Sequence, residues 1–95
     1  MERNLKMSDI GQHKIPLALQ RQIAAAPDDT MFLLLHVDET GPEQFAAIEK
    51  AGYAVRHQTS IVPCFAVSGP GHGLRALVNE AWLVRVEEDG AVETM

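Results

Sequence analysis

Cysteine, aromatic residues and clustered basic residues are all scarce in this chain of 95 residues. Cys64 is the only cysteine, so the chain can form neither a disulfide framework nor a cysteine-based metal site. The net charge is −5 and no basic cluster is present, which argues against nucleic acid as a partner, because neutralising phosphates needs grouped lysine and arginine. No apolar run approaches the ~20 residues that are needed to cross a bilayer, so we expect no membrane partner.

Signals for export, catalysis and cofactor binding are also missing. The polar N-terminal residues 1–12 lack the apolar segment of a secretory signal, so we expect a cytoplasmic protein, with extracellular action left open. Ser60 and Ser68 lack a GxSxG context, and the four histidines are scattered among different elements. We therefore expect a protein without enzymatic activity, cofactor or metal.

The hydrophobic content of 46% is ordinary for a globular protein. A single domain of this size buries only about 60–65% of the surface that its unfolded chain exposes, so its core is small. We divide the chain into residues 1–29, an N-terminal tail with a short helix that docks weakly, and residues 30–95, the main domain. The last six residues, 90–95, contain one glycine and no proline, and we expect them to form an extended, accessible tail.

Hydrophobic periodicity and turn residues predict the order of the helices and strands. Within the main domain, Thr40 and Glu43 have the spacing of a capping box, and Gly52 suits a left-handed helix stop. The predicted elements are a helix at 15–26, a strand at 31–37, a helix at 40–51, strands at 53–59 and 63–68, a helix at 74–81 and a strand at 82–87.

This order, βαββαβ, is typical of a ferredoxin-like α+β fold. We expect an open-faced sandwich: a four-stranded antiparallel sheet with the two helices on one face and the first and third strands in the middle. The apolar run at 31–37 is so short that a buried helix is an alternative. The acids on both sides limit it to the length of a strand.

Both central strands are apolar on both faces, although a sheet covered on one side should have one polar face. In the third strand, Cys64 and Ala66 alternate with residues for the core, and in the last strand Val84 and Val86 point opposite to Leu83, Arg85 and Glu87. A partner is therefore expected to cover the second face. We predict that its contacts include the following residues: Cys64, Ala66, Leu83 and Arg85.

The last strand also carries a resemblance. Residues 84–89 read Val-Arg-Val-Glu-Glu-Asp, and with the tail that follows them they resemble the end of a subtilisin propeptide, the peptidase inhibitor I9 family. The resemblance covers residues 30–95. It implies a protein inhibitor or intramolecular chaperone of a subtilisin-like serine protease. Because no protease domain is present, the resemblance implies a free-standing member whose partner is bound in trans and covers the sheet with two surface helices.

The resemblance also implies roles for the acids that follow the last strand. Glu87 and Asp89 are two apart, on one side of a continuing strand, and would cap the N-termini of the two protease helices, which attract anions. The alternative is a solvated charged turn that discourages pairing at the sheet edge.

For the tail, the resemblance implies occupation of the protease cleft in the manner of a cleaved product, with main-chain bonds giving affinity and alternate side chains filling pockets. Met95 would fill the primary pocket, Thr94 would come next, and Glu93 and Val92 would follow, with Val92 in the fourth pocket. A frayed terminus without a function is the alternative.

Two other functions fit parts of the sequence. A regulatory ferredoxin-like module could pair its open face with a second copy as a homodimer, which explains the apolar strands but gives the tail no role. A small-ligand sensor would use the glycine loop at 69–73, although that loop matches no phosphate-binding motif.

Overall fold

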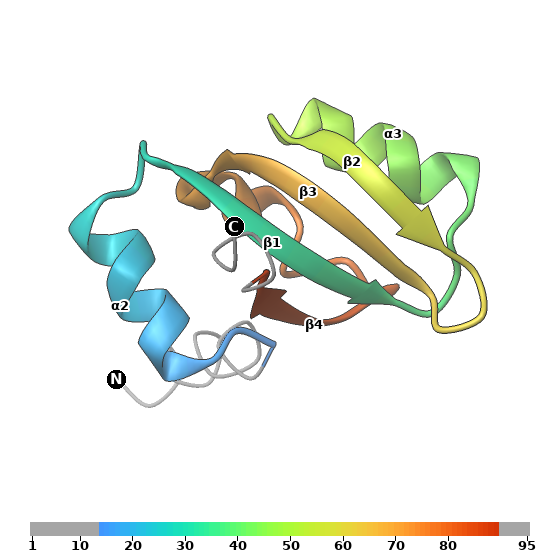
Figure 1. The fold of residues 1–95 in the computed structure, drawn as a ribbon, viewed down its shortest axis with the longest axis horizontal. Coiled ribbons are helices and arrows are strands. Elements are labelled where there is room, and N and C mark those ends of the chain that lie inside the picture. The colour runs from blue at the N-terminus through green and yellow to red at the C-terminus, as the bar shows by residue number, and fades with distance from the viewer. Residues whose placement is uncertain (1–13, 90–95) are drawn as a thin grey trace.

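The computed structural model describes residues 14–89, which form an α+β fold built on one open, four-stranded antiparallel sheet (Figure 1). Its elements are α2 (Leu17–Ala25), β1 (Thr30–Val37), α3 (Pro42–Lys50), β2 (Ala54–Thr59), β3 (Cys64–Pro70), the 3-10 helix η1 (Gly71–Ala76) and β4 (Leu83–Glu88). All four strands and the first two helices lie within a few residues of their predicted positions.

The strand order is β2-β3-β1-β4, so the first and third strands lie in the middle, as expected. The β1–β3 register pairs Leu33 with Val67 and Leu35 with Phe65. These four side chains are completely buried, and they all point to the same face of the sheet because side chains alternate along each strand.

The hydrophobic core lies on this one face. The ring of Phe45 from α3 meets the ring of Phe65 edge-on at a centroid distance of 6.3 Å. Helices α3 and η1 both contribute buried side chains, so they cover the same face. The remaining buried apolar residues are Leu19, Val37, Ile48, Tyr53, Leu74, Leu77, Leu83 and Val86.

Helix α3 begins one residue later than the predicted capping box. Gly41 is the N-cap, and its amide donates a hydrogen bond of 3.1 Å to Oε1 of Gln44, while Thr40 faces Ser60 instead. The predicted stop is confirmed: Gly52 follows the helix with φ of 105°, in the left-handed region that favours glycine.

The α-helix that we predicted at 74–81 is wrong, because the chain forms the short η1 and then turns. Leu74 and Leu77 are both buried, and their spacing of three fits the three-residue turn of a 3-10 helix. Gly73 lies so close to the end of α3 that an added Cβ would come within 2.6 Å of the Ala51 carbonyl oxygen. A side chain would therefore not fit at position 73, and after η1 the chain turns at residues 77–79 instead of continuing as a helix.

The prediction of which side of the sheet each β4 side chain points to is also wrong in part. The β1–β4 register pairs His36 with Arg85 but Val37 with Leu83, so Val84 is an extra residue at a β-bulge. The bulge reverses the alternation: Leu83 and Val86 are both buried, whereas Val84 is exposed.

The N-terminal segment shares the core of the sheet. Leu19 of α2 is buried, the Val86 amide donates to the Lys14 carbonyl oxygen at 2.7 Å, and the Lys14 ammonium donates to the carbonyl oxygens of Val78 and Glu80. These contacts tie Lys14, at the start of the described chain, to the outer edge of β4 and to the segment before it.

Replacing Leu19 by alanine should therefore lower the free energy of unfolding by about 2–3 kcal/mol, because it leaves a cavity in the shared core. Leu17→Ala on the same helix is the matched control, since Leu17 is 59% exposed and should change stability by less than about 0.5 kcal/mol. Urea unfolding of both variants checks this, and equal effects would show that α2 is not part of the core.

Candidate functional site

The face of the sheet opposite the core carries a row of side chains that are only partly covered. Eight residues make up this surface, which we call the open face: Phe32, Leu34 and His36 of β1, Cys64, Ala66 and Ser68 of β3, and Arg85 and Glu87 of β4. None of the eight is buried, whereas the residues between them on β1 and β3 are, so only one side of the sheet is sealed.

The centre of the open face is lined by small side chains, and its rim carries charged ones. The three residues of β3 have small side chains, and the neighbouring Leu34 is half-buried. Phe32, at one end of β1, is 37% exposed. β3 itself contributes no long side chain to this surface, although Arg56 of β2 reaches across it to the Phe32 ring.

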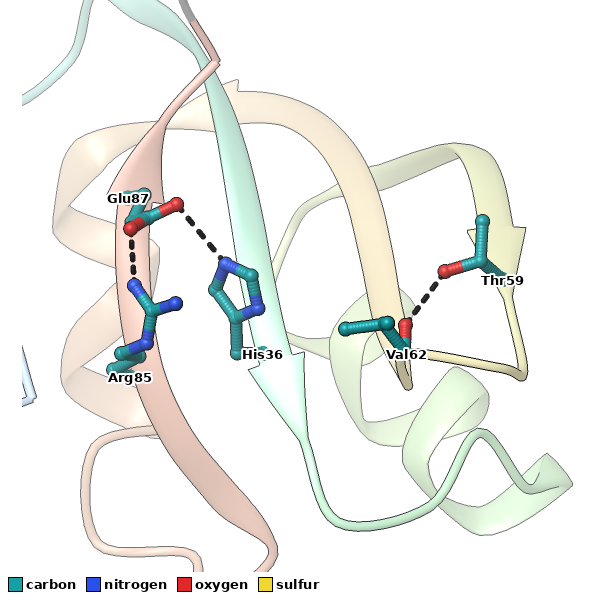
Figure 2. Close-up of polar contacts among 5 residues, drawn as sticks. All are labelled: His36, Thr59, Val62, Arg85 and Glu87. Atoms are coloured by element: carbon teal, nitrogen blue, oxygen red, sulfur yellow. Dashed lines mark hydrogen bonds and ion pairs between the residues drawn. The ribbon is translucent and has the colours of Figure 1, made fainter.

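One end of the open face holds a three-residue polar cluster, visible in Figure 2. Nε2 of His36 lies 3.1 Å from Oε1 of Glu87, and Arg85 donates to the other carboxylate oxygen of Glu87. Hydrogen bonding to Arg85 and then to His36 lowers the pKa of Glu87. The carboxylate is thus held ionised on β4 while its side chain stays 42% exposed.

The other end holds a second cluster, which joins strands from both edges of the sheet. Arg56 of β2 places its guanidinium carbon 4.8 Å from the centre of the Phe32 ring. Its Nη1 donates to Oδ2 of Asp89 at 3.2 Å, and the Asp89 amide donates to the Phe32 carbonyl oxygen at 2.8 Å. Asp89 follows β4 directly and therefore continues its pairing with β1.

Cys64 lies beside His36 in the β1–β3 register. Burial, and then the negative charge of Glu87, raise the pKa of the Cys64 thiol. The thiol is therefore mainly neutral near pH 7, which fits an apolar contact residue better than a nucleophile.

Three of the four predicted sheet-face contacts lie on the open face: Cys64, Ala66 and Arg85. Leu83 does not, because the bulge at Val84 turns it into the core, where it is 1% exposed. Glu87 and Asp89 do share a side of the sheet, as their spacing predicted, and each contacts an arginine. The predicted cleft residues Val92, Glu93, Thr94 and Met95 lie outside the described residues.

Sequence reasoning missed Arg56, His36 and Phe32 as parts of the site. The reach of Arg56 to Asp89 depends on the β2–β3 register, which shifts between Val55 and His57. A bulge of this kind leaves no signature in a six-residue strand. The acidic run at 87–89 was the sequence signal that pointed to the end of β4.

The glycine loop that suggested a ligand sensor is packed into the fold. Gly71 and Gly73 are buried within η1, and the Tyr53 hydroxyl donates to the Gly71 carbonyl oxygen at 3.3 Å. Within residues 14–89, no three His, Cys, Asp or Glu side chains are grouped as a metal site would require. Among the described helices, none has the length and apolar character to span a membrane.

Comparison with known proteins gives no relative. The chain matches no protein-family model, no curated protein and no solved structure. The features that bear on function are therefore the geometry of the open face and of the two clusters at its ends.

Replacing Glu87 by glutamine should destabilise the fold near neutral pH, because the ionised carboxylate accepts bonds from Arg85 and His36. Its pKa in the folded state is depressed, so this contribution is present above the ordinary glutamate value of about 4.3 and is lost as the pH falls through the lower folded value. Urea unfolding at a series of pH values should show the wild type and Glu87→Gln converging in acid. Glu88→Gln, on the next residue and exposed, is the control; a pH-independent gap for Glu87→Gln would contradict the assignment.

Proposed function

We propose that this chain is a free-standing inhibitor or folding partner of a subtilisin-like serine protease, bound in trans, and that it acts by binding rather than by catalysis. The observation that carries the proposal is the position of β4: it borders the open face with Arg85 and Glu87 and runs directly into Asp89 and the segment 90–95. One rigid strand thereby joins a docking face to a terminal segment.

The fold supports the proposal. We propose that the sheet is of the ferredoxin-like type, because the antiparallel order β2-β3-β1-β4 has the first and third strands in the middle and α3 joins β1 to β2. The second crossover departs from that type, since the short η1 replaces an α-helix. It still contributes Leu74 and Leu77 to the same core, so the opposite face stays open.

The open face supports docking on helices. At the end of the face away from Arg56, the small side chains of Cys64 and Ala66 leave room for a partner helix, and Leu34 offers apolar contact beside them. Helix N-termini carry unsatisfied N–H groups and attract anions. Of the two proposed capping acids, Glu87 is the better exposed, at 42% of its side chain, whereas the Asp89 side chain is 11% exposed and bound to Arg56.

The proposed role of the tail follows from its attachment. Residues 92–95 would lie in the protease cleft as an extended strand, with Met95 in the primary pocket and Val92 in the fourth. Thr94 would occupy the second position and Glu93 the third.

Removing residues 92–95 should abolish inhibition and leave the fold intact. The loss of several main-chain hydrogen bonds, each worth about 1 kcal/mol, should weaken inhibition by roughly 100-fold or more. The measurement is the hydrolysis of a fluorogenic peptide by a purified subtilisin at about 1 µM inhibitor, with thermal unfolding recorded alongside.

Glu49→Gln, at an exposed position of α3 away from the open face, is the control and should inhibit like the wild type. The proposal fails if the full chain leaves the activity of subtilisin and of other subtilisin-like proteases unchanged, or if the truncated chain inhibits equally well.

A second candidate function is self-association through the open face. It is favoured by the exposure of Phe32 and by the presence of both arginine and glutamate on β4, which could meet their complements across a two-fold axis. Light scattering distinguishes the candidates: a stable dimer that an Ala66→Arg substitution dissociates supports self-association, and a monomer that binds protease supports inhibition.

A further inference from the structure

We infer that Arg56 is a positioning residue that holds Asp89 at the end of β4, and so fixes the base of the proposed inhibitory segment. The inference rests on the proposed function, since it assigns the part of the scaffold that aims the proposed inhibitory segment. It starts from a contact between opposite edges of the sheet: Arg56 belongs to β2 and Asp89 follows β4, with β3 and β1 between them.

The reach of Arg56 depends on two features of the sheet. The β2–β3 register shifts between Val55 and His57, so Arg56 occupies a bulge, a device that re-aims a side chain. The intervening strand β3 presents Ala66 and Ser68 toward the open face, and neither is large enough to obstruct a long side chain lying across it. The guanidinium thus arrives over Phe32 on β1, with its carbon 4.8 Å from the ring centre.

Asp89 is held from two sides at that point. Its amide donates to the Phe32 carbonyl oxygen at 2.8 Å, which extends the β1–β4 pairing by one residue beyond Glu88. Its carboxylate accepts from Arg56 at 3.2 Å, and its side chain is only 11% exposed, so solvent screens this pair less than it would a fully exposed one. Main chain and side chain are therefore fixed together.

This double attachment determines where the tail begins. Glu88 is the last residue of β4, and strand ends fray unless their last residues are tied down. The contacts with Arg56 and Phe32 hold Asp89 in a defined position at the rim of the open face. A segment that is aimed before binding loses less conformational freedom on entering a cleft, and so binds more tightly.

Arg56 and Asp89 also form a different kind of site from the cluster at Glu87. Arg85 and Glu87 both belong to β4, so their bond does not link separate strands, and His36 adds only the neighbouring β1. Arg56 alone among these residues connects β2 to the end of β4. This assigns Glu87 to contact with the partner and Asp89 to the base of the tail.

The first test needs no protease. In Arg56→Gln, amide hydrogen exchange at Asp89 should accelerate by roughly 10-fold, because the strand end loses its side-chain anchor, while exchange at Leu35 and Phe65 in the sheet centre stays unchanged. Arg75→Gln is the matched control, since Arg75 is an exposed arginine of η1 on the core side. Asp89→Asn should accelerate exchange similarly, and the double variant should show no further increase.

The second test measures inhibition of a purified subtilisin by the full chain. Arg56→Gln should weaken inhibition by roughly 10-fold with little change in thermal stability, Arg75→Gln should not, and Arg56 and Asp89 should again be non-additive. An unchanged Asp89 exchange rate in Arg56→Gln overturns the inference. So does faster exchange with undiminished inhibition. If the wild-type chain inhibits no protease, the proposed function fails while the exchange measurement still decides whether the clamp exists.

Discussion

The pairing of β1 with β3 is the constraint on which the rest of the structure depends. Leu33, Leu35, Phe65 and Val67 are completely buried on one side, and strict alternation then presents every intervening residue on the other. A one-residue slip would exchange the two sides. The apolar core therefore fixes the composition of the open face as well as the fold, and any function of that face is set by the same register.

Much of the fold could be predicted from the sequence because its signals are local. The strand at β1 is bracketed by acids, and Gly52 ends α3 in the only conformation that favours glycine. The predictions that failed depend on packing between distant segments. The short η1 replaces the predicted α-helix where Gly73 packs closely against Ala51, and the bulge at Val84 turns Leu83 into the core. Bulges adapt one strand to its neighbour, and a strand read alone does not reveal them.

The candidate site was predicted in the same uneven way. Glu87 stood out because acids cluster after β4, and Cys64 and Ala66 because an apolar strand continued on both faces. Arg56 gave no such signal, since an arginine in an edge strand is ordinarily a solvated residue. Its role emerges only when β2, β1 and the end of β4 are brought together. The two acids that resembled each other in sequence thus have different surroundings, one exposed at the rim and one held at the base of the tail.

The central claim, that a protease covers the open face, can be tested at Cys64. It is the only cysteine of the chain, so iodoacetamide reports on that face alone. A saturating subtilisin whose catalytic serine is replaced by alanine should slow alkylation of Cys64 by roughly 10-fold or more, as burial in an interface excludes the reagent. A cysteine introduced on α3 by Ala46→Cys, in a Cys64→Ser background, should react at the same rate with and without the protease. Protection on α3 and not at Cys64 would contradict the account.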